Sequence, residues 1–328
     1  MVLEPSEATG GKKGWKTLIA AHIENGEVSV GDFPKPKRQT LIRMTTAGIC
    51  NTDLELKAGY YGFKGIPGHE FVGVVEKGPL EWQGKRVVGE INLACQKCDW
   101  CRRGLARHCP RRTVLGIVKH PGAFAEYLTL PAENLLEVPK SLPDEEAVFT
   151  EPVAAACEIL EQVKIPKGGE VAVLGDGKLG LLIGQVLLAN GINVHQFGRH
   201  PEKLRIVKNR GAIIGKNPPL AHFQYVVDAT GSAQGLATAV SMCQPRGTVI
   251  MKSTVHNKTG IDMATVIVPE ITLVGSRCGR FAPALKLLQQ GKIDVQSMIH
   301  ATYNLKEAKD AFAHAETKGA LKVLLINP

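Results

Sequence analysis

Four cysteines lie within one stretch of fifteen residues, CQKCDWCRRGLARHC. They are Cys95, Cys98, Cys101 and Cys109, separated by two, two and seven residues. Gaps this short allow one loop to supply all four thiolates of a tetrahedral Zn²⁺ site, and a closed site of this kind is structural rather than catalytic. Iron–sulfur proteins also use C-x-x-C-x-x-C, but the longer fourth gap favours zinc. Iron and sulfide in an elemental analysis would reverse this assignment.

A second group of residues has the chemistry of a reactive metal site. Zinc accepts mixed sulfur, nitrogen and oxygen ligands. Cys50, His69, Glu70 and Glu151 offer such a set, although they are far apart in the chain. Each alone has an ordinary structural explanation, such as a buried cysteine or an acid at a helix start. Together they predict a catalytic zinc.

The segment GDGKLG predicts a dinucleotide-binding loop, because it follows an expected strand and opens an expected helix. Gly175 permits the tight turn, Gly177 lets a pyrophosphate approach the backbone, and Gly180 allows the helix to pack against the strand. Lys178 and Leu179 begin the helix, whose free N–H groups attract phosphate. The alternative is a loop that merely needs flexible glycines.

The end of the next expected strand bears on the choice of nucleotide. An NAD site usually places an acid there, about 20 residues after the glycines. This chain instead reads Phe197-Gly198-Arg199-His200. Arg199 is suited to pair with a 2′-phosphate, with His200 or Lys203 assisting, so the sequence predicts NADP(H). Alternatively, Arg199 is an ordinary surface residue and selectivity is loose.

The pattern of expected secondary structure changes near residue 145. Before it, short apolar or alternating runs separated by turns predict an antiparallel, barrel-like domain. These runs are 18–23, 27–30, 40–44, 70–76, 86–90, 122–129 and 135–138. After it, strands and helices alternate, which predicts βαβ units around a parallel sheet. The expected helices are 145–163, 178–188, 201–208 and 282–290, and the expected strands are 171–175, 192–197, 225–228, 248–251, 271–274 and 322–326.

Composition is that of a globular protein. The 328 residues are 44% hydrophobic and 22% charged, enough for two domains. The net charge of +9 is concentrated in part around the cysteines, and without aromatic stacking platforms it does not indicate nucleic-acid binding. Neither a membrane span nor a secretory signal is evident, so we expect a cytoplasmic protein with residues 1–14 as a flexible tail.

The ordered motifs of the chain resemble the zinc-dependent medium-chain dehydrogenase/reductase family, which includes alcohol, polyol and threonine dehydrogenases. The resemblance runs from about Trp15 to the C-terminus. It covers GICNTDLE, GHEFVG, the cysteine segment, GAFAEY, TEPVAAA, GDGKLG, VVDATGS and ALKLLQQGKIDVQSMI. It implies a GroES-like antiparallel β-barrel catalytic domain over 15–150, with a structural-zinc lobe at about 91–112. A Rossmann doubly wound domain over 151–275 and a return to the catalytic domain over 276–328 complete the expected fold.

The resemblance also implies roles for residues. Cys50 and His69 match catalytic zinc ligands, while Glu70 and Glu151 match acids at the metal, and either is the third ligand. Asp53 matches an acid that supports the histidine, and Thr52 matches the hydroxyl that bonds the substrate oxygen. Thr230 and Gly231, within VVDATGS, match positions near the cofactor. Many relatives place a histidine where this chain has Glu55. Beyond Thr52 the proton is expected to leave through Glu55, water or the ribose hydroxyl, and the choice among them stays open. The connector before the cysteines is also short, which leaves the substrate entrance unpredicted.

These assignments predict an oxidoreductase in which two zinc ions serve each chain and a hydride passes between NADP(H) and an alcohol or carbonyl substrate. Glu151 tilts the expected substrate towards polyols, and relatives imply a homodimer or homotetramer. Two alternatives remain from the sequence. One is a zinc-independent, NADPH-dependent alkene reductase on the same fold, and the other is a non-enzymatic NADPH-binding protein.

Overall fold

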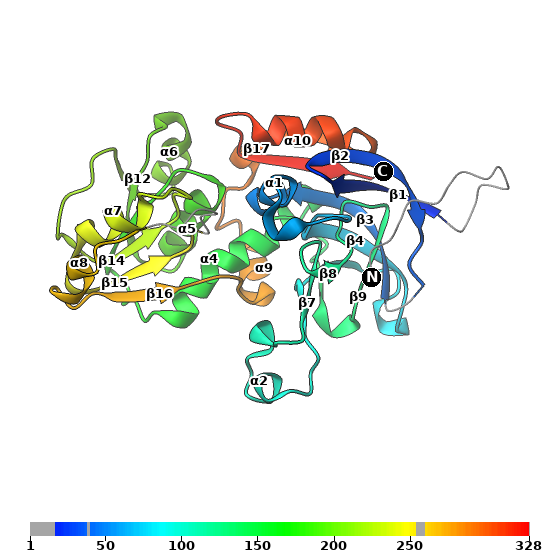
Figure 1. Cartoon of the computed structure of the whole chain (residues 1–328), viewed down its shortest axis with the longest axis horizontal. Coiled ribbons are helices and arrows are strands. Elements are labelled where there is room, and N and C mark those ends of the chain that lie inside the picture. The colour runs from blue at the N-terminus through cyan, green and yellow to red at the C-terminus, as the bar shows by residue number, and fades with distance from the viewer. Residues whose placement is uncertain (1–16, 38–39, 254–259, 328) are drawn as a thin grey trace. The chain divides into compact units, whose positions relative to one another are not determined.

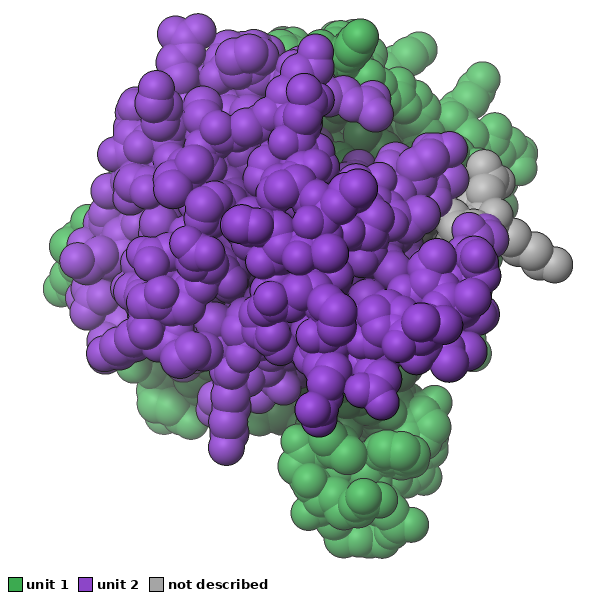
Figure 2. All heavy atoms as spheres, turned by 90° about the vertical axis from the view of Figure 1, so that its left-hand side faces the viewer, with its two compact units in different colours: residues 1–151, 298–328 green, residues 152–297 purple. Residues whose placement is uncertain are grey.

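The computed structural model describes residues 17–37, 40–253 and 260–327, so the predicted tail over 1–14 lies outside the described residues. The chain divides into two compact units, coloured separately in Figure 2. Unit 1 comprises residues 1–151 and 298–328, and unit 2 comprises residues 152–297. Among the described residues, no helix is long and apolar enough to cross a membrane.

Unit 1 is built from short strands, most of them antiparallel (Figure 1). Its strands are β1 (Thr17–Glu24), β2 (Glu27–Pro34), β3 (Thr40–Ile49), β4 (Glu70–Lys77), β5 (Arg86–Gly89), β6 (Asn92–Leu93), β7 (Thr113–Leu115), β8 (Lys119–His120), β9 (Tyr127–Leu130), β10 (Leu135–Glu137), β17 (Ile299–Asn304) and β18 (Lys322–Ile326). Its helices are α1 (Asn51–Lys57), α2 (Asp99–Arg102), α3 (Asp144–Ala147) and α10 (Ala308–Glu316). Single 3₁₀ turns are η1 (Tyr60–Gly62), η2 (Leu80–Trp82), η3 (Ala106–His108), η4 (Ala132–Asn134) and η6 (Leu305–Glu307).

The main sheet of unit 1 joins β3, an early strand, to β18, the last strand of the chain. Its order is β10-β5-β4-β3-β18-β17, with β9 also paired to β3. The C-terminal strand β18 therefore lies antiparallel to β3. Strands β6, β7 and β8 form a separate small sheet, and α2 and η3 lie between β6 and β7 in the sequence. This arrangement agrees with the GroES-like domain expected from the sequence.

Unit 2 holds a six-stranded parallel sheet in the order β13-β12-β11-β14-β15-β16. Its strands are β11 (Glu170–Leu174), β12 (Asn193–Phe197), β13 (Ile213–Gly215), β14 (Phe223–Asp228), β15 (Cys243–Met251) and β16 (Thr272–Gly275). Its helices are α5 (Lys178–Ala189), α6 (Pro201–Lys208), α7 (Gly235–Met242), α8 (Ala264–Ile267) and α9 (Phe281–Gln289). Numbered along the chain, this strand order is 3-2-1-4-5-6, the order of dinucleotide-binding Rossmann folds.

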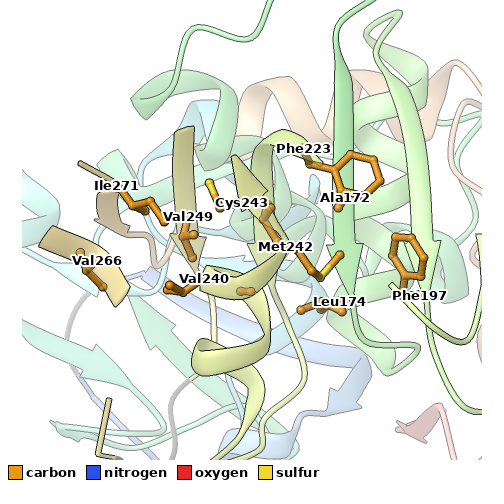
Figure 3. Close-up of a cluster of buried hydrophobic side chains, with 12 residues drawn as sticks. Ala172, Leu174, Phe197, Phe223, Val240, Met242, Cys243, Val249, Val266 and Ile271 are labelled. Carbon is orange, nitrogen blue, oxygen red and sulfur yellow. The ribbon is translucent and has the colours of Figure 1, made fainter. Parts of the chain in front are cut away.

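Helices pack on both faces of this parallel sheet. Successive strand residues point to opposite faces, so Gln196 and Phe197 of β12 mark the two sides. Phe197 belongs to an apolar cluster with Met242 of α7 and Val266 of α8 (Figure 3). On the other side, Gln196 lies under Gly184 of α5. The doubly wound layers predicted from the sequence are thus present.

Two expectations need correction. The single helix expected over 145–163 is interrupted, because α3 ends at Ala147 and α4 (Thr150–Gln162) begins only at Thr150. The chain also returns to unit 1 at residue 298 rather than 276. Residues 276–297 stay with unit 2 because Gly279 packs against the backbone of α4 at Ala154 and Arg280 pairs with Glu161 at 2.9 Å. The 3₁₀ turn η5 (Gln296–Met298) marks the crossing.

Candidate metal centres and dinucleotide loop

The four clustered cysteines converge in the structure. Their sulfurs all lie within 4.8 Å of one another. Cys98 Sγ is 3.4 Å from Cys101 Sγ and 3.7 Å from Cys109 Sγ, and Cys95 Sγ is 4.0 Å from Cys101 Sγ. A tetrahedral zinc with Zn–S bonds of about 2.3 Å requires sulfurs about 3.8 Å apart. The donor set and its spacing therefore fit one Zn²⁺ in the cysteine lobe (residues 91–112).

The electrostatics of the cysteine lobe favour thiolate. The backbone N–H of Lys97 bonds to the Cys95 sulfur and lowers the pKa of that thiol to about 6. Arg111 also bonds to Cys95. Burial, together with the neighbouring sulfurs, raises the pKa of Cys101 to about 11. Metal ligands must be deprotonated, so zinc binding would release a proton from Cys101.

Strand pairing brings the second group of candidate ligands together. Gly48 of β3 lies opposite Glu70 of β4. Cys50, two residues beyond Gly48, therefore lies near His69 and Glu70. One ligand atom from each of these three residues lies within 4.8 Å of the others. Cys50 is half-buried, while His69 is 3% exposed and Glu70 is fully buried.

Asp53 ties the two ligand-bearing segments to each other. Its side chain caps α1 by accepting a hydrogen bond from the Cys50 N–H at 2.8 Å. Its other oxygen accepts one from Gly68 N–H at 3.2 Å and lies 3.4 Å from His69 Nδ1. Burial lowers the pKa of His69, but the opposing effects of Asp53 and then of Cys50 are together larger. The pKa of His69 therefore lies well above its usual value. The support that sequence reasoning assigned to Asp53 has a geometric basis here.

Glu70 offers one oxygen that no described residue uses. Its Oε2 pairs with Lys322 Nζ, whereas its Oε1 is buried and accepts no hydrogen bond. A buried carboxylate oxygen without a donor is costly unless it has another partner, and a cation bound by Cys50 and His69 would be one. The residues present thus fit a zinc ion.

The other residues expected at this metal, Glu151, Thr52 and Glu55, lie outside the group of three ligands. Glu151, at the start of α4, is buried but does not belong to the convergent group of three ligands. Thr52 lies in the first turn of α1, where its Oγ1 is 3.8 Å from Cys50 Sγ. Glu55 stands three residues further along α1, on the same side of the helix. Both Thr52 and Glu55 are half-buried.

The glycine loop of unit 2 has the geometry that sequence reasoning required. It joins β11 to α5, and Gly177 is the residue immediately before the helix. Gly175 has φ +116°, and a Cβ there would lie 2.5 Å from Ala229 O. A Cβ on Gly180 would collide with Gly175 O, whereas one on Gly177 would meet nothing. The open space at Gly177 leaves the N-terminus of α5, at Lys178 and Leu179, accessible to a phosphate, so the loop fits a dinucleotide.

Thr230 and Gly231 follow β14 at the same, carboxyl-terminal edge of the sheet, where ligands of open α/β sheets bind. Both are held by hydrogen bonds. Thr230 donates from its backbone and hydroxyl to Asp228 Oδ1 at 3.0 and 2.8 Å. The Gly231 N–H donates to Ser253 Oγ at 2.9 Å.

Comparison with known proteins gives a consistent result. The chain matches the family model for an alcohol dehydrogenase GroES-like domain over residues 36–140, and that for a zinc-binding dehydrogenase over residues 179–290. It is 30% identical to the alcohol dehydrogenase TADH from Thermus sp. ATN1, whose structure superposes with a TM-score of 0.85 over 94% of this chain and 99% of that one. The chain belongs to the zinc-dependent medium-chain dehydrogenase/reductase family.

Two further relatives of this dehydrogenase are similar over nearly their full length. A sorbitol dehydrogenase from Halalkalibacterium halodurans is 27% identical, with 94% of this chain and 98% of that protein aligned. A putative zinc-binding dehydrogenase from Sinorhizobium meliloti 1021, solved bound to NADP, is 26% identical with a TM-score of 0.87. That alignment covers 95% of this chain and 100% of the other.

Sequence reasoning missed Lys322, which the fold of this dehydrogenase brings to the metal group. Val323 of β18 pairs with Ile49 of β3, so Lys322 lies beside Cys50. Burial opposes the charge of the ammonium, but Glu70, Cys50 and Glu151 more than offset it and raise the pKa of Lys322. No motif precedes or follows Lys322, and only the strand pairing reveals it.

Asp176 was also missed, although it lies inside the glycine motif. Its Oδ2 accepts hydrogen bonds from the backbone N–H groups of Arg199 and His200, at 2.6 and 2.7 Å. These are the residues at the end of β12 on which the nucleotide prediction rests. Burial raises the pKa of Asp176, but the hydrogen bonds from His200 and Arg199 outweigh it, and the pKa is lowered.

Proposed function

We propose that this chain is a zinc-dependent oxidoreductase that transfers a hydride between a nicotinamide dinucleotide and an alcohol/carbonyl pair. The observation that carries the proposal is the convergence of Cys50, His69 and Glu70, with Glu70 Oε1 buried and lacking a donor. Cysteine, histidine and carboxylate form the mixed donor set of a catalytic zinc that keeps a position open for substrate.

Polyols are the proposed substrate class. The chain is similar to a sorbitol dehydrogenase from Halalkalibacterium halodurans and to a D-arabinitol dehydrogenase from Uromyces fabae, at 27% and 26% identity. The acid Glu151, where many alcohol dehydrogenases have cysteine, supports the same assignment.

Residues of α1 handle the proton in this proposal. Bound zinc supplies a Lewis acid that makes a hydroxyl group more acidic. The Thr52 hydroxyl donates to, or accepts from, the substrate oxygen, and Glu55 passes the proton towards solvent from the same side of the helix. The glycine loop and the N-terminus of α5 orient the dinucleotide so that its nicotinamide is held in one position.

Replacing Thr52 with valine should lower the turnover number about a hundredfold, because a positioned proton-transfer group contributes about that much. Zinc content should not change, since Thr52 Oγ1 is not in the ligand group. The matched control is Thr52→Ser, which keeps the hydroxyl and should retain most of the activity. Steady-state kinetics on the three proteins test this, and full activity in Thr52→Val would refute the role.

The cysteine lobe is proposed to hold a second, structural zinc. We expect Cys98→Ser to reduce the zinc content by one equivalent per chain, whereas Cys278→Ser, outside both ligand groups, should leave it unchanged. Arg102 and Arg103 are exposed on the lobe. Trypsin should therefore cut there once the metal no longer holds the loop folded. Elemental analysis and a digestion time course measure both effects, and unaltered zinc in Cys98→Ser would contradict the assignment.

The predicted preference for NADP(H) rests on Arg199, whose side chain is exposed. The similar protein from Sinorhizobium meliloti was solved with NADP bound. Against these stands the carboxylate of Asp176, held at the same strand end.

Oligomer and compartment stay predictions. Strand β16 is at the edge of the unit 2 sheet, which agrees with the predicted pairing of residues 271–274 across a twofold axis. Nearby Ile267 and Val268 are 66% and 80% exposed. Light scattering would distinguish a homodimer or homotetramer from a monomer.

A panel of polyols, simple alcohols, aldehydes and activated alkenes, followed by nicotinamide absorbance, tests the function. Oxidation of polyols that is lost on chelation supports the proposal. Alkene reduction that is insensitive to chelators would favour the zinc-independent reductase, and dinucleotide binding without any turnover would favour a non-enzymatic protein.

A further inference from the structure

Asp176 lies where a dinucleotide-binding fold is expected to bind the adenosine ribose. In such folds the end of the second strand faces the ribose 2′ position, and an acid there binds the 2′-hydroxyl of NAD. In this chain the end of that strand, β12, carries no acid. It is met instead by the carboxylate of Asp176, which arrives from the glycine loop.

The space beside the end of β12 is filled by an acid that belongs to a different element, the glycine loop. A Cβ built on Gly198, the first residue after β12, would lie 2.5 Å from Asp176 Oδ2 and 2.6 Å from Asp176 Cβ. The carboxylate of Asp176 therefore fills the volume that a side chain at position 198 would need. An acid at the strand end and Asp176 exclude each other sterically, and this chain has the second arrangement.

The hydrogen bonds of Asp176 leave one oxygen free to bind a ligand. Oδ2 accepts the N–H groups of Arg199 and His200 and lies 3.1 Å from His200 Nδ1. Oδ1 accepts no hydrogen bond from the described residues. A carboxylate oxygen accepts a hydrogen bond from a ribose hydroxyl, whereas it repels a 2′-phosphate, which carries about two negative charges at neutral pH.

Arg199 should have a weaker effect than Asp176 on the choice between NAD(H) and NADP(H). Its guanidinium is exposed, so water and salt screen its attraction for a phosphate. The side chain of Asp176 is only 13% exposed and is held by three contacts. The backbone donors that would otherwise bind a phosphate, and one ring nitrogen of His200, are already engaged by Asp176.

We propose that Asp176 is the residue that selects the dinucleotide, binding the 2′-hydroxyl and rejecting a 2′-phosphate, so that the chain prefers NAD(H). This inference rests on the proposed use of a nicotinamide dinucleotide and opposes the NADP(H) preference predicted from Arg199. It assigns cofactor choice to the variable position between the first two glycines of the loop, where an acid is close enough to reach the end of β12.

The test compares binding and does not require turnover. Dissociation constants for NADH and NADPH are measured by fluorescence on the wild-type chain, Asp176→Asn and Glu202→Gln. Asparagine keeps the shape and an acceptor for the two N–H groups but removes the charge. Glu202, exposed in the first turn of α6, controls for a general loss of one negative charge.

The wild-type chain should bind NADH more tightly than NADPH. In Asp176→Asn the ratio of the NADPH to the NADH dissociation constant should fall about tenfold, because a nearby unit charge no longer opposes the phosphate. In Glu202→Gln the ratio should stay within about twofold of wild type, since exposed charges are screened. Calorimetry with ADP and 2′,5′-ADP should show the same pattern without the nicotinamide half.

A relocated acid provides a second test. Gly198→Asp alone should weaken both dinucleotides, because the new side chain collides with Asp176. In the Asp176→Ser background, Gly198→Asp should restore the preference for NADH over NADPH. A double variant that discriminates no better than Asp176→Ser would overturn the inference.

Two other results would also overturn it. They are tighter binding of NADPH than NADH by the wild-type chain, and an unchanged ratio in Asp176→Asn. Failure of the wild-type chain to bind either dinucleotide would overturn the proposed cofactor class as well. Binding with an unchanged ratio would refute the role of Asp176 alone.

Discussion

Replacing Cys50 with serine should lower the turnover number about a thousandfold, because a Lewis-acidic metal contributes several kcal/mol to such a reaction. Cys50 is one of three residues whose ligand atoms lie within 4.8 Å of one another, and serine is a much poorer zinc ligand than thiolate. The variant should contain one zinc fewer per chain. Dinucleotide binding should persist, since the glycine loop belongs to unit 2.

The matched control is Cys278→Ser, which changes a thiol outside both ligand groups. It should keep its zinc and its activity. Zinc content and steady-state kinetics are measured on the same preparations. A Cys50→Ser protein that turns over at the wild-type rate would show that the metal group is not the reaction centre.

Replacing Lys322 with methionine should destabilise unit 1 by about 3–5 kcal/mol, the usual effect of removing one partner from a buried ion pair. Lys322 is 1% exposed and its partner Glu70 is fully buried. Methionine fits the volume of the aliphatic stem but leaves the carboxylate without its counter-charge. The free energy of unfolding, from urea titration of the chelated proteins so that no bound zinc compensates the carboxylate, measures the effect.

Two further variants serve as controls for the stability of Lys322→Met. Lys57→Met removes a comparable pair, with Glu316, whose side chains are 25% and 42% exposed, and it should change stability by less than about 1 kcal/mol. Adding Glu70→Gln to Lys322→Met should recover part of the loss, because the uncompensated charge disappears. Equal stability losses in Lys322→Met and Lys57→Met would contradict the buried pair.

The parallel sheet was the more predictable part of the fold. Its strands are continuous apolar runs, and its glycine loop has a spacing that few other structures require, so α5 and α6 lie close to where the sequence put them. Three elements of unit 2 were missed, β13, α7 and α8, and α8 is only four residues long. Strand β13 is only three residues long, and α7 (GLATAVSM) carries glycine and β-branched residues that weaken the helical signal.

Motif reasoning proposed most residues of the candidate site, because ligand types and spacings can be read from the sequence. It could not find Lys322 or Asp176, for different reasons. Lys322 reaches Cys50 only through the pairing of β18 with β3, which joins distant parts of the chain. Asp176 is a variable position in its motif, and its reach to the end of β12 depends on the conformation of the loop. Both are contacts that require the fold to be known.

The most direct test of the central claim is isotopic. A polyol deuterated at the reacting carbon is incubated with oxidised dinucleotide and either zinc-loaded or chelated protein, and the reduced cofactor is analysed by NMR. Zinc-dependent hydride transfer predicts deuterium at C4 of the nicotinamide with the zinc-loaded protein and almost none after chelation. Equal labelling by the metal-depleted protein, or none by the zinc-loaded protein with any alcohol in the panel, would contradict it.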